Sequence, residues 1–276
     1  MRSLPIQKIL AWFSILLFAV FSIYPMLYVL GISLRGDNAF QSQSLEIITS
    51  TSTMKNFLDL FTQTDFLIWL RNSLLVSVGT TLLGVAFAST SAYALSRFQF
   101  RGRNMMLFSL LATQMFPPTM LILPFYIILS KLHLIDSFWG LFLIYSSTAL
   151  PFCVWQMKAY YDTIPKELEE AAILDGCSRW LTFCKIILPL SAPALVITAL
   201  FSFMASWSEY VVAAVVLQDP QMYTLPLGLR SFQASLATQW GLYAAGALIV
   251  SLPVLILFIS ISRYLISGLT IGSVKG

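Results

Sequence analysis

Charged residues leave six long gaps along the chain. No Asp, Glu, Lys, Arg or His occurs within these gaps, and each is rich in Leu, Ile, Val, Phe or Ala. A membrane-spanning helix needs about 20 predominantly apolar residues, so every gap is long enough. Strands of a membrane barrel alternate over about 10 residues, which these runs do not. The pattern predicts six transmembrane helices, at about 9–34, 72–95, 105–130, 138–157, 192–216 and 241–263.

The composition excludes a soluble fold. Hydrophobic residues make up 58% of the 276 residues and charged residues only 10%, whereas a soluble domain carries about 25% charged residues. Arg2 and Lys8 precede the first apolar run, as in a signal peptide. That run continues to Arg35 without a clear small-residue cleavage site, so a retained helix is the better interpretation. We therefore predict an all-α membrane protein with one transmembrane domain, 1–276, and a large inner loop, 158–190.

The basic residues predict the orientation. With the N-terminus inside, 11 of the 16 Lys and Arg residues lie in inner segments and 5 in outer ones. The positive-inside rule favours this arrangement, and an even number of crossings places both termini in the cytoplasm. The basic turn 97–103 is the strongest local signal, and the net charge of +4 requires no nucleic-acid partner. Cys153, Cys177 and Cys184 have no ordered spacing, so we expect small buried hydrophobic residues and no disulfide or metal site.

Within the inner loop, the segment 166–175 has the signals of a short cytoplasmic helix. Pro165 suits the first turn of a helix, and three glutamates follow where the helix dipole favours anions. Gly176 can adopt the left-handed conformation that ends a helix.

Leu168, Ala171 and Ala172 recur at i, i+3 and i+4, which predicts one apolar stripe of mostly small side chains. Small side chains allow another surface to approach the backbone closely. A helix this short is marginal alone, so we expect it to be held by a partner or by the chain's own helices. An amphipathic connector lying on the bilayer is the alternative.

The spacing in this loop resembles a motif of ABC importer permeases. That motif reads Glu-Ala-Ala, three residues, Gly, nine residues, Ile, one residue and Leu-Pro, and the chain matches it from Glu170 to Pro189 with Ile186 and Leu188 in place. The resemblance implies that this helix docks in a cleft of an ATPase subunit and transmits its opening and closing. The coupling residues that it implies are Lys166, Glu167, Leu168, Glu170, Ala171, Ala172, Asp175, Gly176 and Pro189.

The resemblance extends over nearly the whole chain. Arg71-Asn72-Ser73, Ala92-Tyr93-Ala94 and the ending 268–276 are similar to the sugar-importing branch, in particular to the maltose-type second permease. This implies the six-helix type I importer permease fold in a bacterial inner membrane. The implied partners are a second homologous permease, two ATPase subunits and an extracytoplasmic solute-binding protein. The resemblance also implies that the C-terminal tail reaches the ATPase dimer interface, and a frayed terminus is the alternative. The residues of this predicted contact are Gly272, Val274, Lys275 and Gly276.

The chain has no ATP site of its own. A phosphate-binding loop of the form G-x-x-x-x-G-K-[ST] does not occur in it. We therefore expect ATP and Mg²⁺ on the partner ATPase, no cofactor on this chain, and the role of a transport subunit rather than an enzyme.

Polar residues at membrane depth are candidates for a translocation path. A membrane carboxylate normally faces a bundle interior or a wet cavity, so Glu209 either lines the path or hydrogen-bonds a neighbouring helix. Gln114 and the proline pair at 117–118 would break the third helix, either as a gate or as a plain kink. Aromatic residues beside Glu209 suit the apolar faces of a sugar. The candidate path residues are Gln114, Pro117, Trp207, Glu209 and Tyr210.

The outer loop 218–240 is the candidate contact with the binding protein. In maltose-type relatives the corresponding loop reaches into that protein, so the resemblance implies a docking role here. A lid over the outer vestibule is the alternative. The residues concerned are Asp219, Tyr223, Arg230 and Gln239.

We therefore predict a permease subunit that imports a sugar, oligosaccharide or sugar-like solute. An ABC permease for a non-sugar polar solute is the first alternative. An ion-coupled secondary transporter would carry more paired intramembrane acids and bases, and a non-transporting scaffold would need no coupling motif.

Overall fold

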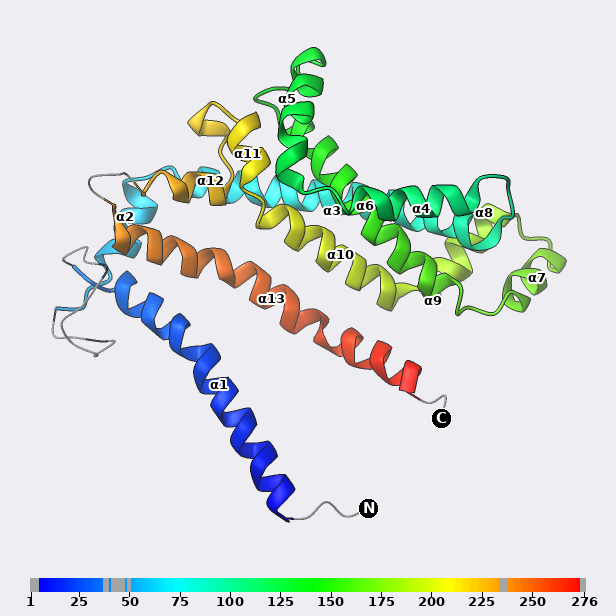
Figure 1. The fold of residues 1–276 in the computed structure, drawn as a ribbon, viewed down its shortest axis with the longest axis horizontal. Coiled ribbons are helices and arrows are strands. Elements are labelled where there is room, and N and C mark those ends of the chain that lie inside the picture. The colour runs from blue at the N-terminus through cyan, green and yellow to red at the C-terminus, as the bar shows by residue number, and fades with distance from the viewer. Residues whose placement is uncertain (1–4, 37–39, 41–47, 49–50, 234–237, 274–276) are drawn as a thin grey trace. The chain divides into compact units, whose positions relative to one another are not determined.

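The computed structural model describes residues 5–36, 40, 48, 51–233 and 238–273. In this part of the chain every element is a helix, apart from one isolated antiparallel bridge between Arg35 and Ser52. In chain order (Figure 1) the helices are α1 (Pro5–Ser33), α2 (Lys55–Thr62), α3 (Phe66–Arg97), α4 (Arg103–Thr113), η1 (Pro118–Leu121), α5 (Ile122–Lys131), α6 (Phe138–Tyr161), α7 (Glu167–Leu174), α8 (Arg179–Thr182), η2 (Phe183–Ile187), α9 (Leu188–Leu190), α10 (Ala192–Trp207), α11 (Val211–Val216), η3 (Pro220–Met222), α12 (Leu225–Arg230) and α13 (Trp240–Ser273).

Several of these helices are long and apolar enough to cross a membrane. Among the described residues four do so singly, and two further pairs pass the same test together although each is bent at a short break. The spans number four, or six if each bent pair is one span. The single helices are Lys8–Ser33, Phe66–Arg97, Phe138–Tyr161 and Trp240–Ser262, and the bent pairs are Arg103–Thr113 with Pro118–Lys131 and Arg179–Leu190 with Ala192–Trp207.

The charge-free gaps predicted where the spans lie but not where they end. α3 is longer at both ends than the predicted 72–95, and Arg71 lies exposed within it. The predicted outer segment 35–70 contains α2 and the start of α3, and α13 continues to Ser273 where a tail was predicted. A helix can continue past its apolar stretch because a charged side chain such as that of Arg71 stays exposed while the backbone remains helical.

The predicted third helix, 105–130, is broken. α4 ends at Thr113, and a 3-10 turn that begins at Pro118 leads into α5, so that the two pieces are bent by 99°. Pro117 is extended, with φ −59° and ψ 129°. Proline has no N–H to donate, and a residue that precedes a proline is disfavoured in the helical region. The pair therefore stops one helix and starts the next, which corrects the expectation of a plain kink.

The predicted fifth helix, 192–216, is also interrupted, because it stops at Trp207 and resumes as α11. Glu209 lies in the gap. Its carboxylate accepts hydrogen bonds from the N–H groups of Val212 (2.8 Å) and Ala213 (3.2 Å). The first N–H groups of a helix have no partner within it, so this carboxylate caps α11.

The chain divides into two units, residues 1–67 with 228–252 and residues 68–227 with 253–276. In the first unit, the side chain of Asn56 donates to the carbonyl oxygens of Ser33 (2.9 Å) and Arg35 (2.8 Å) at the end of α1. α2 is thereby fastened to the turn that follows α1.

In the second unit α6 and α10 run side by side (Figure 1). α3 approaches both of them closely through glycines. A Cβ atom at Gly79 would lie 2.6 Å from the ring of Phe142 in α6, and one at Gly84 would lie 3.0 Å from the hydroxyl of Ser202 in α10. Lipid is as apolar as a helix surface, so close packing of small residues is what favours helix association in a membrane.

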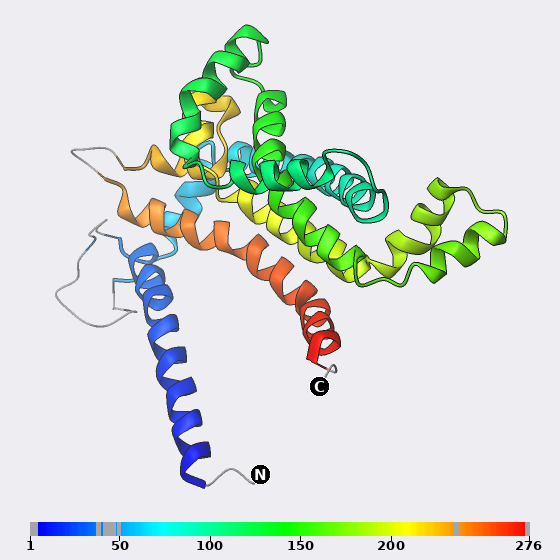
Figure 2. The ribbon, with the colours of Figure 1, turned by 45° about the vertical axis from the view of Figure 1, so that its right-hand side comes forward.

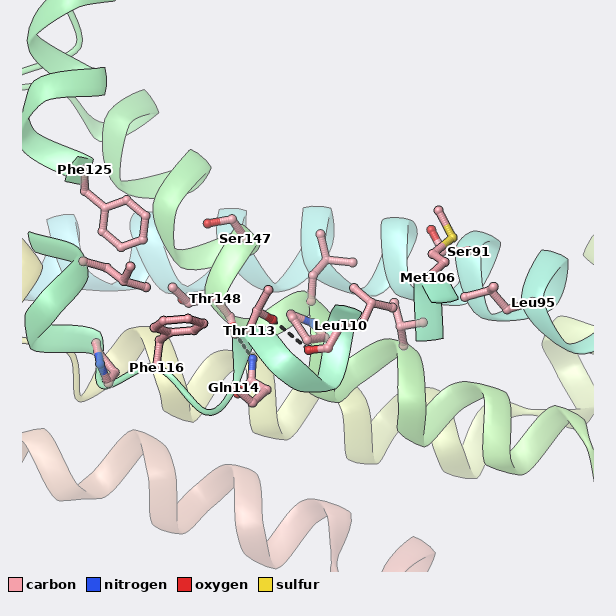
Figure 3. Close-up of a pocket in the computed structure, with 15 residues that line it drawn as sticks. Ser91, Leu95, Met106, Leu110, Thr113, Gln114, Phe116, Phe125, Ser147 and Thr148 are labelled. Carbon is pink, nitrogen blue, oxygen red and sulfur yellow. Dashed lines mark hydrogen bonds between the residues drawn. The ribbon is translucent and has the colours of Figure 1, made fainter. Parts of the chain in front are cut away.

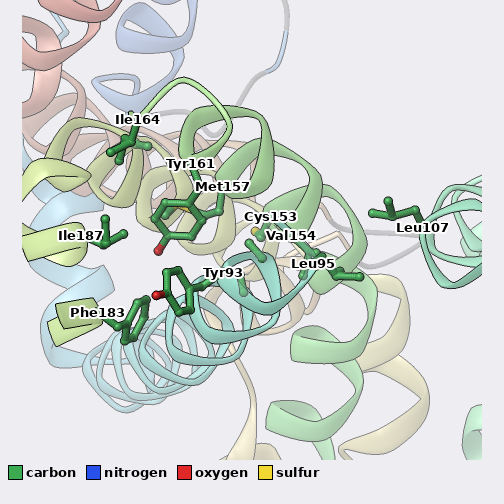
Figure 4. Close-up of a cluster of buried hydrophobic side chains, with 13 residues drawn as sticks. Tyr93, Leu95, Leu107, Cys153, Val154, Met157, Tyr161, Ile164, Phe183 and Ile187 are labelled. Carbon is green, nitrogen blue, oxygen red and sulfur yellow. The ribbon is translucent and has the colours of Figure 1, made fainter. Parts of the chain in front are cut away.

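Two buried clusters hold the second unit together. Both include α3 and α6, and they are named here the Tyr93 cluster (Figure 4) and the Tyr145 cluster. The Tyr93 cluster comprises Ala88, Ala92, Tyr93, Leu95, Leu107, Cys153, Val154, Met157, Tyr161, Ile164, Phe183, Ile187 and Ala194. The Tyr145 cluster comprises Val76, Leu129, Leu141, Ile144, Tyr145, Val212, Ala213, Val216, Leu217 and Leu227.

Candidate functional site

The predicted cytoplasmic helix is present as α7, one residue shorter at each end than the predicted 166–175. Its first turn carries Glu167, Glu169 and Glu170, where the positive end of the helix dipole stabilises negative charge. The helix lies in the segment between α6 and α8, so α6 connects to α10 through it.

Gly176 ends α7 in the way that its residue type indicates. Its φ is 87°, in the left-handed region that side chains disfavour. Its N–H donates to the carbonyl of Ile173 (3.0 Å), and the N–H of Cys177 donates to the carbonyl of Ala172 (2.9 Å), which together form a Schellman motif. No atom lies within 4 Å of where a Cβ would be, so the backbone conformation rather than space requires glycine here.

The inward face of α7 differs from the predicted stripe. Ala172 is buried, but Leu168 and Ala171 are exposed, so the three do not share one buried face. Glu169, three residues before Ala172, is buried instead. Ala172 therefore turns inward beside Glu169, which meets a partner charge inside the molecule, whereas Leu168 and Ala171 remain open to another surface. Leu174, 87% exposed, extends the outward apolar face.

The partner of Glu169 is Arg97, the last residue of α3. The Arg97 Nε forms an ion pair with Glu169 Oε1, and the side chains are only 7% and 11% exposed. The hydroxyl of Tyr93 donates to the other carboxylate oxygen (2.7 Å), and Arg97 Nη2 donates to the carbonyl of Ile164 (3.0 Å). We call this group the Glu169 clamp. From sequence, Arg97 was interpreted only as a topology anchor, and the clamp was missed because its members lie about 70 residues apart.

A second polar link lies next to the clamp. Asp162, directly after α6, accepts hydrogen bonds from Ser96 Oγ and Lys158 Nζ, both at 2.6 Å. Burial raises the pKa of the Asp162 carboxyl, but the hydrogen bonds from Lys158 and Ser96 and the nearby positive charges outweigh it, so the pKa is lowered. The last turn of α3 is therefore bonded both to α7 and to the end of α6.

A cavity of about 560 Å³ opens beside the break between α4 and α5. Gln114 lines it and donates from Nε2 to the carbonyl of Thr148 in α6 (3.2 Å), and the rings of Phe116 and Phe125 line the same space (Figure 3). A mostly apolar cavity of this size with a few polar groups is typical of a ligand site. It is lined by Ser91, Leu95, Met106, Leu110, Thr113, Gln114, Phe116, Pro118, Leu121, Phe125, Ser147, Thr148, Leu150, Pro151 and Val154.

The other candidate path residues do not line this cavity. Pro117 precedes Pro118, which does. Trp207 is buried at 2% exposure and stacks on Phe203, with 5.3 Å between ring centroids, and Tyr210 is 36% exposed. The structure thus brings one of the five candidates, Gln114, to the cavity wall.

Glu209 is held by its own surroundings. In addition to capping α11, its carboxylate accepts a hydrogen bond from the hydroxyl of Tyr145 in α6 (2.7 Å). Three donors therefore occupy its two oxygens, which compensates this half-buried carboxylate for the water that it loses. This geometry matches the second of the two interpretations given above, a hydrogen bond to a neighbouring helix.

The first half of the predicted outer loop, 218–240, is fastened by hydrogen bonds. Asp219 caps the short η3 helix, accepting from the N–H of Gln221 at 2.9 Å. The carboxylate of Asp136, in the turn between α5 and α6, accepts from the N–H groups of Gln218 (3.1 Å) and Asp219 (3.2 Å). Tyr223 follows η3 and is half-buried.

The remaining predicted residues belong elsewhere. Arg230 hydrogen-bonds Gln233, and the N–H of Gln239 donates to the carbonyl of Phe232 (2.9 Å), all within the unit that contains residues 228–252. Gly272 lies within α13, and 274–276, the end of the predicted tail contact, lie outside the described residues.

Comparison with known proteins gives a consistent picture. A family model described as the binding-protein-dependent transport system inner membrane component matches residues 80–269. The maltodextrin transport system permease protein of Bacillus subtilis is 34% identical over 274 residues, covering 98% of this chain and 97% of the relative. The trehalose/maltose transport system permease protein of Thermococcus litoralis is 33% identical over 279 residues, covering 100% of each.

A solved structure shares the fold. One chain in the crystal structure of a bacterial ABC transporter involved in the import of the acidic polysaccharide alginate matches with a TM-score of 0.83 and 23% identity, over 96% of this chain and 98% of that chain. At that identity the match bears on the fold, and it agrees with the predicted importer permease architecture.

Proposed function

The chain belongs to the binding-protein-dependent transport system inner membrane components, and from that premise we propose that a separate ATPase drives it through α7 and that it delivers a sugar or oligosaccharide to the cytoplasm. It is a multi-pass inner-membrane permease subunit of the sugar-importing ABC class. ATP and Mg²⁺ would be bound by the partner, where phosphoryl transfer takes place.

The exposed face of α7 is the observation that carries the coupling proposal. Leu168, Ile173 and Leu174 are 44%, 47% and 87% exposed, and Trp180 just beyond the helix is 66% exposed. Large apolar side chains that stay exposed on a short helix between the long apolar helices point to an interaction surface. Glu170 and Ala171 lie exposed on the same short helix and would set the charge and the closeness of the contact.

The opposite face of α7 supports the same proposal. The Glu169 clamp fixes this eight-residue helix to α3, although a helix of that length is marginal alone. A docking element that must convey force has to be attached to the element that it moves. An amphipathic connector resting on the bilayer would need no buried ion pair.

The partners follow from the family and the relatives. The family name states dependence on a binding protein, and we infer docking of that protein on the loop that includes Asp219 and Tyr223. A second permease of the same fold would complete the path on the other side of the cavity beside Gln114, which is lined here by residues of one chain. Two ATPase subunits would bind the coupling helices of the two permeases.

The substrate class is inferred from the two relatives, which are named for maltodextrin and for trehalose and maltose. The cavity beside Gln114 fits this class, since phenylalanine rings suit the apolar faces of a sugar and an amide suits its hydroxyls. A non-sugar polar solute is the second candidate.

Reconstitution of the chain with its partner permease, ATPase and binding protein tests the proposal. We expect uptake of maltodextrin or trehalose that depends on ATP. Ala171→Trp, which enlarges the exposed face of α7, should abolish uptake and the stimulation of ATP hydrolysis, whereas Ala86→Trp on the exposed face of α3 should not. Wild-type uptake by Ala171→Trp would refute coupling through α7, and uptake of amino acids but no sugar would refute the substrate class.

A further inference from the structure

The first turns of α3 are bonded to the outer loop. Asn72 Nδ2 donates to the carbonyl oxygens of Gln221 (2.8 Å) and Tyr223 (3.0 Å), and the hydroxyl of Ser73 accepts from the N–H of Leu225 (2.6 Å). Asn72 and Ser73 are each 2% exposed. Buried hydrogen bonds of this kind are costly to break, because the freed groups stay unsatisfied. We call these contacts the Asn72 clamp.

The last turns of the same helix carry the Glu169 clamp and the bond from Ser96 to Asp162. α3 is therefore attached at one end to the loop around η3 and at the other to α7. Both ribbon views agree, since they place α7 and α8 near the C-terminal end of α3 and α11 toward its other end (Figures 1 and 2). Every residue of both clamps lies in the unit that contains residues 68–227.

Between the clamps α3 is unbroken. The other three long apolar helices each contain an internal proline, Pro25, Pro151 or Pro253, and α3 contains none. The two remaining candidate spans are bent by 99° and 79°. Proline removes a helical hydrogen bond and kinks the helix. With a rise of about 1.5 Å per residue, the continuous helix covers roughly 38 Å between Asn72 and Arg97.

We propose that α3 is a transmission rod that ties the position of the η3 loop to the position of α7, with Asn72 and Arg97 as its two positioning residues. The proposal rests on the proposed function, since it assigns the route by which an ATPase-driven displacement of α7 reaches the opposite end of α3. A displacement of α7 moves Glu169. The Glu169 clamp then moves α3, and the Asn72 clamp moves the η3 loop.

A route of this kind requires coupling evidence, because residues that lie between two sites need not connect them. If α3 transmits the displacement in series, cutting either clamp or breaking the helix between them should abolish the response of the loop. The response of the ATPase to nucleotide should remain, since that event precedes the cut. These two readouts separate transmission from a merely structural role.

The experiment uses the full complex with a fluorescent bimane label on Gln221→Cys, whose side chain is exposed, after replacement of Cys153, Cys177 and Cys184 by alanine. The ATPase is trapped with ATP, Mg²⁺ and vanadate. Trapped nucleotide is measured in parallel with the change in label fluorescence. When α3 is unaltered, we expect both trapped nucleotide and a change in label fluorescence.

Glu169→Gln removes the ion pair of the Glu169 clamp, and Asn72→Ala removes the hydrogen bonds of the Asn72 clamp. Leu82→Pro breaks α3 between the two clamps, at a position that is 67% exposed. Each should trap nucleotide normally while the label response falls at least fivefold. The exchanged pair Arg97→Glu with Glu169→Arg re-creates the ion pair but not the bonds to Tyr93 and Ile164, so its label response should exceed that of Arg97→Glu alone, which a loss of assembly would not explain. Thr90→Ala, whose hydroxyl bonds only to its own helix, is the matched control and should respond fully.

A full label response in Glu169→Gln, Asn72→Ala and Leu82→Pro would overturn the proposal, as would trapping without any label response in the unaltered background. If one cut variant fails to assemble, the exchanged pair and the other variants decide. Absence of trapped nucleotide in the unaltered complex would instead refute the proposed ATPase coupling, so the two failures are distinguishable.

Discussion

Removal of Arg97 should destabilise the protein far more than removal of another basic residue nearby. In Arg97→Ala the Glu169 carboxylate stays buried and keeps only the hydrogen bond from Tyr93. Breaking a buried ion pair by deleting one partner costs about 3–5 kcal/mol, because an uncompensated charge remains. The side chains are 7% and 11% exposed, so solvent screening is small.

Lys158→Ala is the matched control. Lys158 pairs with Asp162 one helical turn away, and the two side chains are 13% and 43% exposed. Because the carboxylate of Asp162 remains open to water and keeps its bond from Ser96, the loss of Lys158 leaves no buried unpaired charge, and exposed pairs at this spacing contribute only about 0.3–0.5 kcal/mol. We would measure the free energy of unfolding in mixed micelles by SDS titration with tryptophan fluorescence. The loss of this free energy relative to wild type should be several times larger for Arg97→Ala than for Lys158→Ala.

A double-mutant cycle identifies the cause. Glu169→Gln removes the charge that Arg97→Ala leaves unpaired, so the double variant should be less destabilised than the sum of the two single variants. Equal destabilisation by Arg97→Ala and Lys158→Ala, or strict additivity in the cycle, would refute the account of a buried, mutually dependent pair.

Three further outcomes are expected. Gly176→Asp places a side chain at φ 87° and should lower the free energy of unfolding by about 1 kcal/mol or more. It should also uncouple transport, and ATP hydrolysis that is still stimulated by transported sugar would contradict the role of Gly176 in coupling. Glu209→Ala removes the cap of α11 and the acceptor of Tyr145; it should change transport rate or preference without loss of assembly, and an unchanged transport profile would leave Glu209 with a structural role only. The pKa of Asp162 is lowered in the folded state, so its stabilising contribution is present at neutral pH and is lost as pH falls below about 4; Asp162→Asn should therefore be destabilising at pH 7, and the difference from wild type should shrink toward pH 3.

Local signals in the sequence predicted the elements that local physics decides. The charge-free gaps located the apolar helices, and Gly176 marked the end of α7 because a left-handed residue requires glycine. The proline pair at 117–118 marked a break for the same local reason, although the bend of 99° exceeded the expected kink. The family and the importer class followed from the spacing between Glu170 and Pro189, and the comparisons confirm them.

Features that depend on distant residues could not be predicted in this way. Which face of α7 is buried depends on Arg97, about 70 positions earlier, and nothing near Glu169 in the sequence reports that contact. The Asn72 clamp joins residues about 150 positions apart. Arg71-Asn72-Ser73 was noticed only as part of a resemblance, and its physical meaning, a buried anchor for a loop, required the structure.

The Glu169 clamp also sets an order for biogenesis. Arg97 is synthesised 72 residues before Glu169, which at about 5–20 residues per second corresponds to roughly 4–14 s. During that interval the end of α3 carries a cation whose partner does not yet exist, so it must stay hydrated at the membrane surface. Dehydration of Arg97 waits until α6 has been inserted and α7 has been made. A chain that stalls before residue 169 would therefore display an unpaired arginine, a chemical mark by which quality control could distinguish incomplete permeases from finished ones.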